Sequence, residues 1–179
     1  MTGQNKMKRS QTRRRGRFRV RRARVADIRV LVDHRRVSRQ ELGDVAENWT
    51  REDRKYAGWL HPRLRDHEVL GWVGEEQSGE IVGSGCLRLR PTPRVANPNL
   101  IRPHIFAMYT ERNHRGRGIA SAIVKAAIEW CKRKDYERIT LNASEKGRNV
   151  YTRQGFEQSS EMRLKLRRRP GKISRKKAG

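Results

Sequence analysis

Cysteine, aromatic residues and long apolar runs are all scarce in this chain. Its 179 residues include two cysteines, six prolines and 6% aromatic residues. Cys86 and Cys131 both lie in apolar patterns, which predicts buried thiols rather than a disulfide, a nucleophile or a metal ligand. No apolar run reaches the roughly 18 residues of a membrane-spanning helix, and the basic N-terminus lacks the apolar stretch of a secretory signal. These absences favour a cytoplasmic protein with one domain, no metal and no membrane contact.

Acidic residues are also scarce, above all at the two ends of the chain. The sequence has 44 Lys and Arg against 19 Asp and Glu, a net charge of +25. Residues 1–22 and 163–179 contain no acid and supply nineteen of these charges. We therefore expect one domain over residues 17–166 between basic tails at 1–16 and 167–179. Such tails are either solvated segments or an anchor for a polyanion such as RNA, DNA or the ribosome.

The most informative segment joins a strand pattern to a helix pattern through a short basic loop. Residues 105–110 have the β-branched and aromatic content of a buried strand. Downstream, apolar residues recur at helical spacing: Ile119, Ile123, Ala127, Ile128 and Cys131. Gly116 and Gly118 lie at the junction, where exposed backbone N–H groups meet the positive end of the helix dipole. This arrangement predicts a binding site for a phosphate or pyrophosphate.

The loop does not match the two common nucleotide-binding motifs. No Gly-Lys-Ser/Thr closes it as in a P-loop, and it lacks the three-glycine spacing and the later acidic residue of the dinucleotide fingerprint. By itself a Gly-x-Gly pair is equally typical of a plain tight turn. The sequence beyond the helix therefore has to distinguish the two interpretations.

A second motif lies downstream of that helix. Residues 138–141 have the pattern of a short strand, and Ser144 precedes a short helix predicted over residues 147–154. Gly155 ends this helix ahead of Phe156. The order is strand, phosphate loop, helix, strand, short helix and strand.

The two motifs together resemble the acyl-coenzyme A half of the Gcn5-related N-acetyltransferases (GNAT). Arg115–Ala120 is similar to the pyrophosphate motif of that family, Arg/Gln-x-x-Gly-x-Gly/Ala. Leu141–Phe156 is similar to its second motif, which ends in Tyr-x-x-x-Gly-Phe, and residues 161–164 resemble the closing strand of a bacterial subgroup. The resemblance is close over residues 104–166 and diffuse over 18–103. It implies an α/β (α+β) fold with a mixed, mostly antiparallel, splayed sheet of six to seven strands flanked by about four helices.

The first half of the chain supplies further strand patterns for this fold. Three segments have them: the alternation at Phe18 and Val20, residues 68–74 and residues 81–89. The last two form a predicted hairpin around residues 77–79. The segment 91–103 contains four prolines and is predicted as a loop.

Two helices are predicted between the first strand and the hairpin. Residues 25–32 suit the first helix. The second is predicted over residues 40–65, with Trp49 and Trp59 as core anchors and Pro62 limiting its end.

In the family, the sheet opens between the strand before the phosphate loop and the strand after its helix, and the pantetheine arm lies in that cleft. The resemblance therefore places acetyl-CoA, as cosubstrate, against Met108, Tyr109, Thr110, Arg115, Gly116, Arg117, Gly118, Ile119, Ala120 and Ser144. The first three residues follow the arm and the next six surround the pyrophosphate. Arg115 and Arg117 are either phosphate ligands or solvated surface groups. Ser144 replaces the asparagine of many relatives, and its alternative role is a helix cap.

Acetyl transfer from a thioester to an amine needs a neutral amine, a polarised carbonyl and a proton for the departing thiolate. By resemblance, Tyr151 is the catalytic acid, because a phenol with a pKa of about 10 stays protonated at neutral pH. The alternative is a tyrosine that only packs in the core. A backbone N–H near Met108 or Tyr109 would polarise the carbonyl. The general base stays unassigned, since Glu111 lies close to the phosphate loop and His104 has no partner pattern.

The sequence thus predicts an N-acetyltransferase that moves an acetyl group from acetyl-CoA to a primary amine by direct transfer in a ternary complex, as a monomer or homodimer. The alternative is a nucleic-acid- or ribosome-associated protein that uses the fold as a scaffold and the basic tails as an anchor. Residues 41–80 contain ten acids and five bases. These acids either attract a cationic amine or form a charged helix exterior. The acceptor, and the use of acyl groups other than acetyl, stay open.

Overall fold

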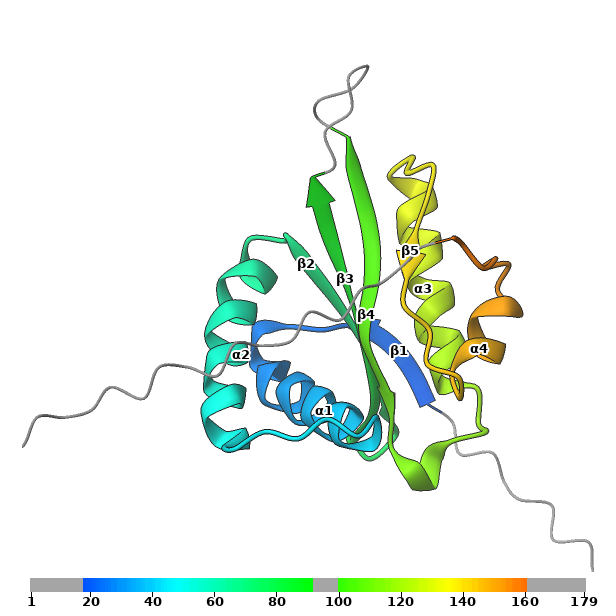
Figure 1. Cartoon of the computed structure of the whole chain (residues 1–179). Helices are drawn as coiled ribbons and strands as arrows, with labels where there is room; N and C mark the ends of the chain where they lie inside the picture. Colours follow the sequence, from blue (N-terminus) through cyan, green and yellow to red (C-terminus); the bar gives the residue numbers. More distant parts are fainter. Residues whose placement is uncertain (1–17, 92–99, 161–179) are drawn as a thin grey trace, which may run out of the picture.

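A sheet with the strand order β1-β2-β3-β4-β5 is the frame of the computed structural model, which describes residues 18–91 and 100–160 (Figure 1). The strands are β1 Phe18–Arg22, β2 Val69–Glu76, β3 Ile81–Pro91, β4 Ile101–Thr110 and β5 Thr140–Leu141. β1 to β4 pair antiparallel with their neighbours, and β5 pairs parallel with β4. This is the mixed, mostly antiparallel sheet that the sequence predicts.

The described sheet has five strands rather than six or seven. The closing strand predicted at residues 161–164 lies outside the described residues, as do both basic tails and residues 92–99 of the predicted loop. Residues 101–103 were predicted as part of that loop and instead begin β4. Pairing with β3 continues through Leu89↔Pro103 to Pro91↔Ile101. The long hairpin therefore overrides the turn preference of proline, which loses only its own N–H donor in a strand.

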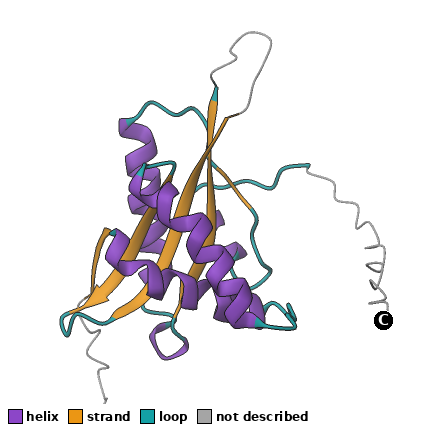
Figure 2. Ribbon diagram, turned by 90° about the vertical axis from the view of Figure 1, so that its left-hand side faces the viewer, coloured by secondary structure: helices purple, strands orange, loops and turns teal. Residues whose placement is uncertain are grey.

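Helices cover both faces of the sheet (Figures 1 and 2). They are α1 Ile28–Glu41, α2 Trp49–Arg65, α3 Ile119–Arg133 and α4 Arg148–Thr152. A single 3-10 turn, Val25–Asp27, leads into α1, and a second, Arg112–His114, lies between β4 and α3. α1 and α2 lie on one face, and α3, with α4 beside it, lies on the other.

The first helix is longer than the predicted residues 25–32. α1 continues to a turn at Gly43, whose φ is +84°. In this turn the N–H groups of Gly43 and Asp44 donate to the carbonyls of Gln40 and Arg39, each at 3.0 Å. This is the hydrogen-bond pattern of a Schellman motif, which satisfies the last carbonyls of a helix. The later turns of α1 are rich in charged residues, so their apolar stripe is too narrow to reveal the helix in the sequence.

The second helix begins later than the predicted residue 40. α2 starts at Trp49, and the side chain of Asn48 caps it by accepting a hydrogen bond from the Arg51 N–H at 3.0 Å. Pro62 lies inside the helix and does not end it. Trp59 packs on the core as predicted, whereas neither core cluster of the described residues includes Trp49.

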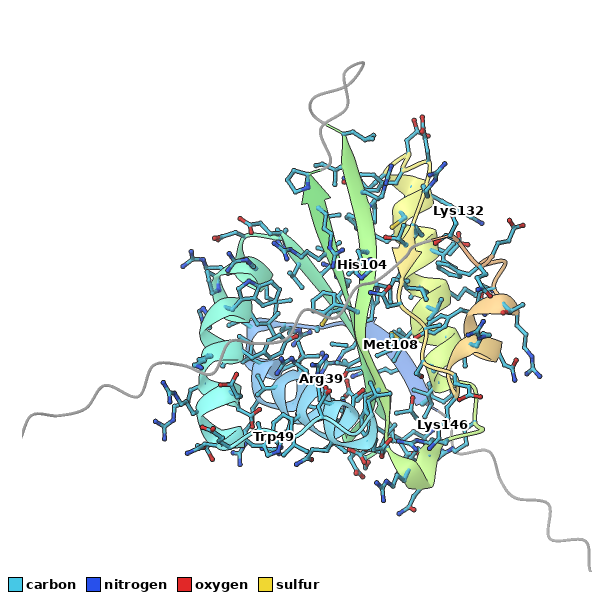
Figure 3. The ribbon with its side chains drawn as sticks, viewed as in Figure 1. Arg39, Trp49, His104, Met108, Lys132 and Lys146 are labelled. Atoms are coloured by element: carbon cyan, nitrogen blue, oxygen red, sulfur yellow. The ribbon has the colours of Figure 1, made fainter. Side chains whose placement is uncertain are left out.

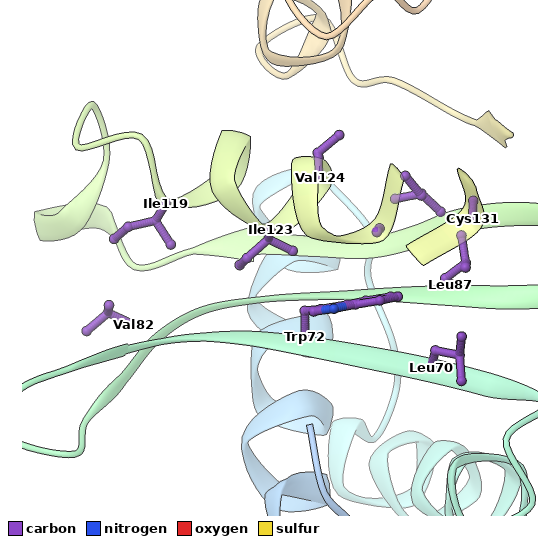
Figure 4. Close-up of a cluster of buried hydrophobic side chains, with 10 residues drawn as sticks. Leu70, Trp72, Val82, Leu87, Ile119, Ile123, Val124 and Cys131 are labelled. Atoms are coloured by element: carbon purple, nitrogen blue, oxygen red, sulfur yellow. The ribbon is translucent and has the colours of Figure 1, made fainter. Parts of the chain in front are cut away.

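Each face of the sheet has its own hydrophobic cluster. The cluster under α3 contains Leu70, Trp72, Val82, Leu87, Ile105, Ile119, Ile123, Val124, Ala127 and Cys131 (Figure 4). The cluster under α1 and α2 contains Leu31, Leu60, Leu64, Val69, Val73 and Cys86. Cys86 and Cys131 are buried free thiols, as predicted. The cluster under α3 fixes this helix against the sheet, and with it the loop that precedes the helix.

Candidate active site

The sheet opens between β4 and β5. The two strands pair only at His104↔Thr140 and Ile105↔Leu141, after which β5 ends and β4 continues to Thr110. A cavity of about 450 Å³ lies at this opening. The expected separation of these two strands is therefore confirmed.

The cavity brings together all of the predicted site residues except Arg117. Its walls come from the end of α1, the second half of β4, the loop before α3 and the α4 region. The predicted residues that line it are Met108, Tyr109, Thr110, Arg115, Gly116, Gly118, Ile119, Ala120, Ser144 and Tyr151. Segments far apart in the sequence thus converge on one hollow.

A β-bulge reshapes β4 beside the cavity. Ser84 pairs with Tyr109 and Cys86 with Phe106, so Gly85 alone faces both Ala107 and Met108. Ala107 has a φ of +50°, which is uncommon for a residue with a side chain. The Met108 side chain packs over Gly85, where an added Cβ would lie 2.1 Å from its sulfur. A bulge leaves one residue out of the strand ladder and bends the strand, and this bulge lies where Met108 and Tyr109 border the cavity.

The loop before α3 presents backbone N–H groups to the same cavity. Gly116 and Gly118 have φ values of +75° and +87°, a left-handed conformation that disfavours residues with a Cβ. The first helical bond of α3 runs from the Ala122 N–H to the Gly118 carbonyl at 2.9 Å. The preceding amides of Ile119 and Ala120 therefore have no partner within the helix. Together with the helix dipole, these amides are a donor set of the kind that can hold an anion.

The two arginines of the loop both pair with carboxylates. Arg115 lines the cavity, donates to Glu41 of α1 at 2.7 and 2.9 Å and donates to the Thr110 carbonyl at 3.0 Å. Arg117 is outside the cavity wall, and its guanidinium pairs with Glu76 of β2 at 2.6 Å. Arg115 is thus within reach of an anion in the cavity, whereas Arg117 ties the loop to the β2–β3 hairpin.

The α4 side of the cavity supplies a tyrosine and a serine. Tyr151 packs edge-on against Phe156, with ring centroids 6.0 Å apart. Burial raises the pKa of the Tyr151 phenol above its ordinary value, so the hydroxyl stays protonated at neutral pH. Ser144 accepts a hydrogen bond from the Gly147 N–H at 3.2 Å, within the turn that precedes α4, whereas the N-cap of α4 is Gly147 and receives no side-chain hydrogen bond. Its side chain still borders the cavity.

Three basic or titratable residues of the cavity wall were missed by the sequence interpretation: His114, Lys146 and Arg153. Lys146 lies in the segment between β5 and α4, where Figure 3 labels it. Lys146 and Arg153 flank the short helix, one before and one after it in the chain, and both border the cavity. This spacing around Tyr151 is the signal that could have identified them.

A buried polar chain joins α1 to β3 and to the end of β4. His34 is 4% exposed, and its Nδ1 lies 2.9 Å from the Ser84 hydroxyl. Its Nε2 lies 3.3 Å from Glu111, which also accepts a hydrogen bond from the Tyr109 hydroxyl at 3.4 Å. Burial lowers the pKa of His34, although Glu111 opposes the shift. Glu111 thus takes part in anchoring α1 and is not among the residues of the cavity wall.

His104 lies in the first of the two β4–β5 pairs, one residue before the opening. It is buried, and its Nδ1 lies 2.9 Å from the Thr140 hydroxyl. Figure 3 shows His104 and Met108 following one another along β4. The ring is therefore near the closed end of the cleft, beyond the residues that line the cavity.

Most acids of residues 41–80 are neutralised locally. Their ion pairs are Glu41 with Arg112 and Arg115, Asp44 with Arg39, Glu52 with Lys55, Asp53 with Arg36, Asp66 with Arg65, Glu68 with Arg63, Glu75 with Arg19 and Arg21, and Glu76 with Arg117. Only Glu41 of these acids lines the cavity. Most of these acids are therefore engaged in local ion pairs, some of them partly buried, and only one contributes negative charge to the cavity wall.

The part of the chain that the structure describes contains neither a metal-ligand cluster nor a membrane-spanning helix. Within residues 18–91 and 100–160, no three or more His, Cys, Asp or Glu side chains are grouped to hold a metal ion. No helix in these same ranges is long and apolar enough to cross a bilayer.

Comparison with known proteins identifies the family. The model of the acetyltransferase (GNAT) family matches residues 31–156. The chain belongs to this family, and its sheet and helices have the family's fold. No curated protein matches the chain.

Solved structures with this fold include several acetyltransferases. A GCN5-related N-acetyltransferase from Ralstonia eutropha JMP134 is 27% identical, with a TM-score of 0.75, over 84% of this chain and 99% of that one. A predicted acetyltransferase from Clostridium acetobutylicum, solved with acetyl-CoA, is 26% identical with a TM-score of 0.74, over 84% and 96% of the two chains. A ribosomal-protein-alanine N-acetyltransferase from Brucella melitensis is 20% identical with a TM-score of 0.62, over 84% and 99%, which shows the fold alone.

Proposed function

We propose that this protein is an N-acetyltransferase that moves an acetyl group from acetyl-CoA to a primary amine by direct transfer in a ternary complex. The observation that carries the proposal is the cavity at the opening between β4 and β5, where the bulge, the amides at the start of α3 and Tyr151 meet. Family membership and the similar Clostridium structure with acetyl-CoA support the choice of cosubstrate.

The donor set suits a diphosphate. The amides of Ile119 and Ala120 would hold the pyrophosphate, and hydrogen bonds to a charged group contribute about 1.5–3 kcal/mol each. Lys146, Arg153 and Arg115 would add positive charge around it. Backbone groups of Met108, Tyr109 and Thr110 would follow the pantetheine arm along the free edge of β4. Acetyl-CoA supplies the activated acetyl group.

Two groups of this chain would act on the thioester. The backbone N–H at Met108 or Tyr109 would donate to the carbonyl oxygen as it gains charge, an oxyanion-hole role that the bulge favours. The Tyr151 hydroxyl would give its proton to the departing thiolate. The raised pKa of this phenol keeps the proton available.

The amine must lose a proton before it attacks. For an amine with a pKa of about 10.4, deprotonation at pH 7 costs about 4.6 kcal/mol. We assign no side chain to this step. A chain of water molecules leading out of the cleft would serve, and His104 lies near its closed end.

The experiment that tests the proposal is release of the coenzyme A thiol from acetyl-CoA by the purified full chain, measured over a panel of primary amines. We expect amine-dependent thiol release with at least one class of amine, and transfer of the acetyl group confirmed by the mass of the product. Thiol release that is the same with and without every amine would contradict an N-acetyltransferase.

A further inference from the structure

The ends of β3 and β4 place a set of arginines, of which Arg90 is exposed and Arg88 and Arg102 are half-buried, on the face that α1 and α2 cover. Cys86 and Phe106 pair across the strands and both belong to the cluster under α2, which fixes that face. Side chains alternate along a strand. Arg88 and Arg90 therefore share the face of Cys86, and their cross-strand partners His104 and Arg102 share that of Phe106. β3 and β4 extend past α1 and α2 here (Figures 1 and 2).

An aromatic side chain holds two guanidiniums at this surface. The Arg63 guanidinium lies 4.9 Å from the Trp59 ring centroid, and that of Arg88 lies 5.4 Å from it. Arg63 also donates to the Trp59 carbonyl at 2.9 Å. Cation–π contacts of this kind hold positive charges in place. The two guanidiniums are thus prearranged around one indole.

The arrangement concentrates charge of one sign. The described carboxylates nearby are Glu68, 3.6 Å from Arg63, and Glu137, which borders a small hollow with Arg102 and Arg138. Four guanidiniums, those of Arg63, Arg88, Arg102 and Arg138, lie beside these two carboxylates, so positive charge is in excess and the surface attracts anions.

The surface lies beside the path that an acceptor would take. α3 and α4 occupy one face of the cleft between β4 and β5, and Tyr151 comes from that side. The acceptor would therefore approach from the α1/α2 face. Along β4, the rung of Arg88 and His104 lies four residues from Met108, or about 13 Å at 3.3 Å per residue, and two residues from Phe106, or about 7 Å.

We infer that the acceptor is a small primary amine that carries an anionic group, a phosphate or a carboxylate, at the far end of the molecule. Arg88 and Arg102 bind that group while the amine lies over the bulge at Met108. This inference rests on the proposed function and assigns the substrate class of the same site. Charge-assisted bonds to a phosphate or carboxylate are what guanidinium groups make best.

A matched series of hexyl amines tests the inference on the full chain. Aminohexyl phosphate and aminoheptanoate carry the anion, aminohexanol is neutral and diaminohexane is cationic. We expect the phosphate or the carboxylate to have a kcat/KM at least about tenfold above that of aminohexanol, with diaminohexane the poorest, because a lost charged hydrogen bond costs that much or more. The anionic amine with the higher kcat/KM shows whether the acceptor carries a phosphate or a carboxylate.

Three variants localise the effect. Arg88→Gln and Arg102→Gln should each raise KM for the anionic amine about tenfold and leave both KM for aminohexanol and acetyl-CoA affinity unchanged. Arg54→Gln, on the exposed side of α2, is the matched control and should change nothing. Arg102→Gln keeps the test valid if loss of the Trp59 contact unfolds Arg88→Gln.

Equilibrium binding separates the inference from the proposed function. NMR titration of the protein with aminohexyl phosphate and aminohexanol needs no turnover. Tighter binding of the phosphate that Arg88→Gln and Arg102→Gln weaken, without any thiol release, would retain the anion site and reject the transferase. Equal binding and equal turnover of the neutral, cationic and anionic amines, or unaltered constants in both variants, would overturn the inference.

Discussion

At the scale of single residues, burial sets the protonation of two groups near the site. Burial disfavours the charged form of any side chain, so it raises the pKa of an acid and lowers that of a base. The pKa of Tyr151 is raised and that of His34 is lowered, each with burial as the largest cause. Both side chains are therefore neutral at pH 7, that of Tyr151 beside the cavity and that of His34 between α1 and β3.

Replacing Tyr151 by phenylalanine tests the proposed acid. The variant keeps the ring that packs on Phe156 and loses only the hydroxyl. We expect kcat for acetyl transfer to fall about a hundredfold or more, the range of a general acid, with little change in acetyl-CoA affinity. Steady-state kinetics measure kcat, and calorimetric titration measures the affinity for acetyl-CoA. A kcat equal to that of the wild type would contradict the role of acid and show that the Tyr151 ring only packs in the core.

His34 predicts how stability depends on pH. A histidine whose pKa is lowered by folding stabilises the folded state fully above its unfolded pKa of about 6.5. That contribution is lost as the pH falls through the folded pKa, because the unfolded chain then binds the proton more readily. Ser84, Glu111, Tyr109 and Asp33 surround or influence the ring.

Urea unfolding at several pH values between 7.5 and about 5 measures this effect. We expect the free energy of unfolding to fall across this range and to fall less steeply in His34→Gln. His61→Gln replaces an exposed histidine of α2 and serves as control, with the slope of the wild type. An identical slope in His34→Gln would show that His34 does not carry the pH dependence.

Local chemistry explains which residues the sequence could predict. Gly116, Gly118 and Tyr151 stand in short motifs whose spacing is set by one loop or one helical turn, and all three line the cavity. His34 shows no such spacing, because its partners Ser84 and Glu111 come from strands far along the chain. Only the packing of α1 on β3 and β4 brings them together.

At the scale of elements, strand patterns were more informative than helix boundaries. β2 and β3 match the predicted hairpin because alternation and the turn at residues 77–79 are local signals. α1 ends at a turn in which Gly43 has a positive φ. The surrounding residues are mostly charged, so no apolar pattern indicated in the sequence where this helix ends. The bulge at Ala107 could not be predicted from the sequence, because alanine disfavours the positive φ that it adopts there. This conformation follows from the strand pairing, in which Gly85 alone faces Ala107 and Met108.

The separation of β4 from β5 is an element-scale property that the family resemblance did anticipate. β5 has only two residues, and α4 begins soon after it. A strand this short cannot follow β4 to Thr110, so the second half of β4 has a free edge within the described residues. That free edge is what the pantetheine arm requires under the proposed function.

At the scale of the whole molecule, charge is the dominant feature. Residues 23–162 account for only six of the 25 net charges, and the predicted basic tails lie outside the described residues. The paired acids of residues 41–80 leave the described domain without a large acidic surface around the cavity. A role for the tails in binding RNA, DNA or the ribosome stays a prediction.

Deleting residues 1–16 and 170–179 tests that prediction. If the tails bind a polyanion, the truncated protein should bind RNA more weakly, with a smaller slope of log affinity against log salt, because fewer counterions are released. Turnover of a small amine should stay unchanged, since the cavity lies within the described domain. A salt slope equal to that of the full chain would dismiss the tails as an anchor.

Calorimetric titration with acetyl-CoA tests most directly whether the amides at the start of α3 bind the diphosphate. The comparison is between the wild type, Gly118→Asp and Gly79→Asp, because both glycines have a φ near +87° and open space around a new Cβ, while only Gly118 lines the cavity. We expect tight binding by the wild type and by Gly79→Asp, and at least tenfold weaker binding by Gly118→Asp, whose carboxylate repels the phosphates. Equal affinity in all three proteins, or no binding by the wild type, would contradict the account.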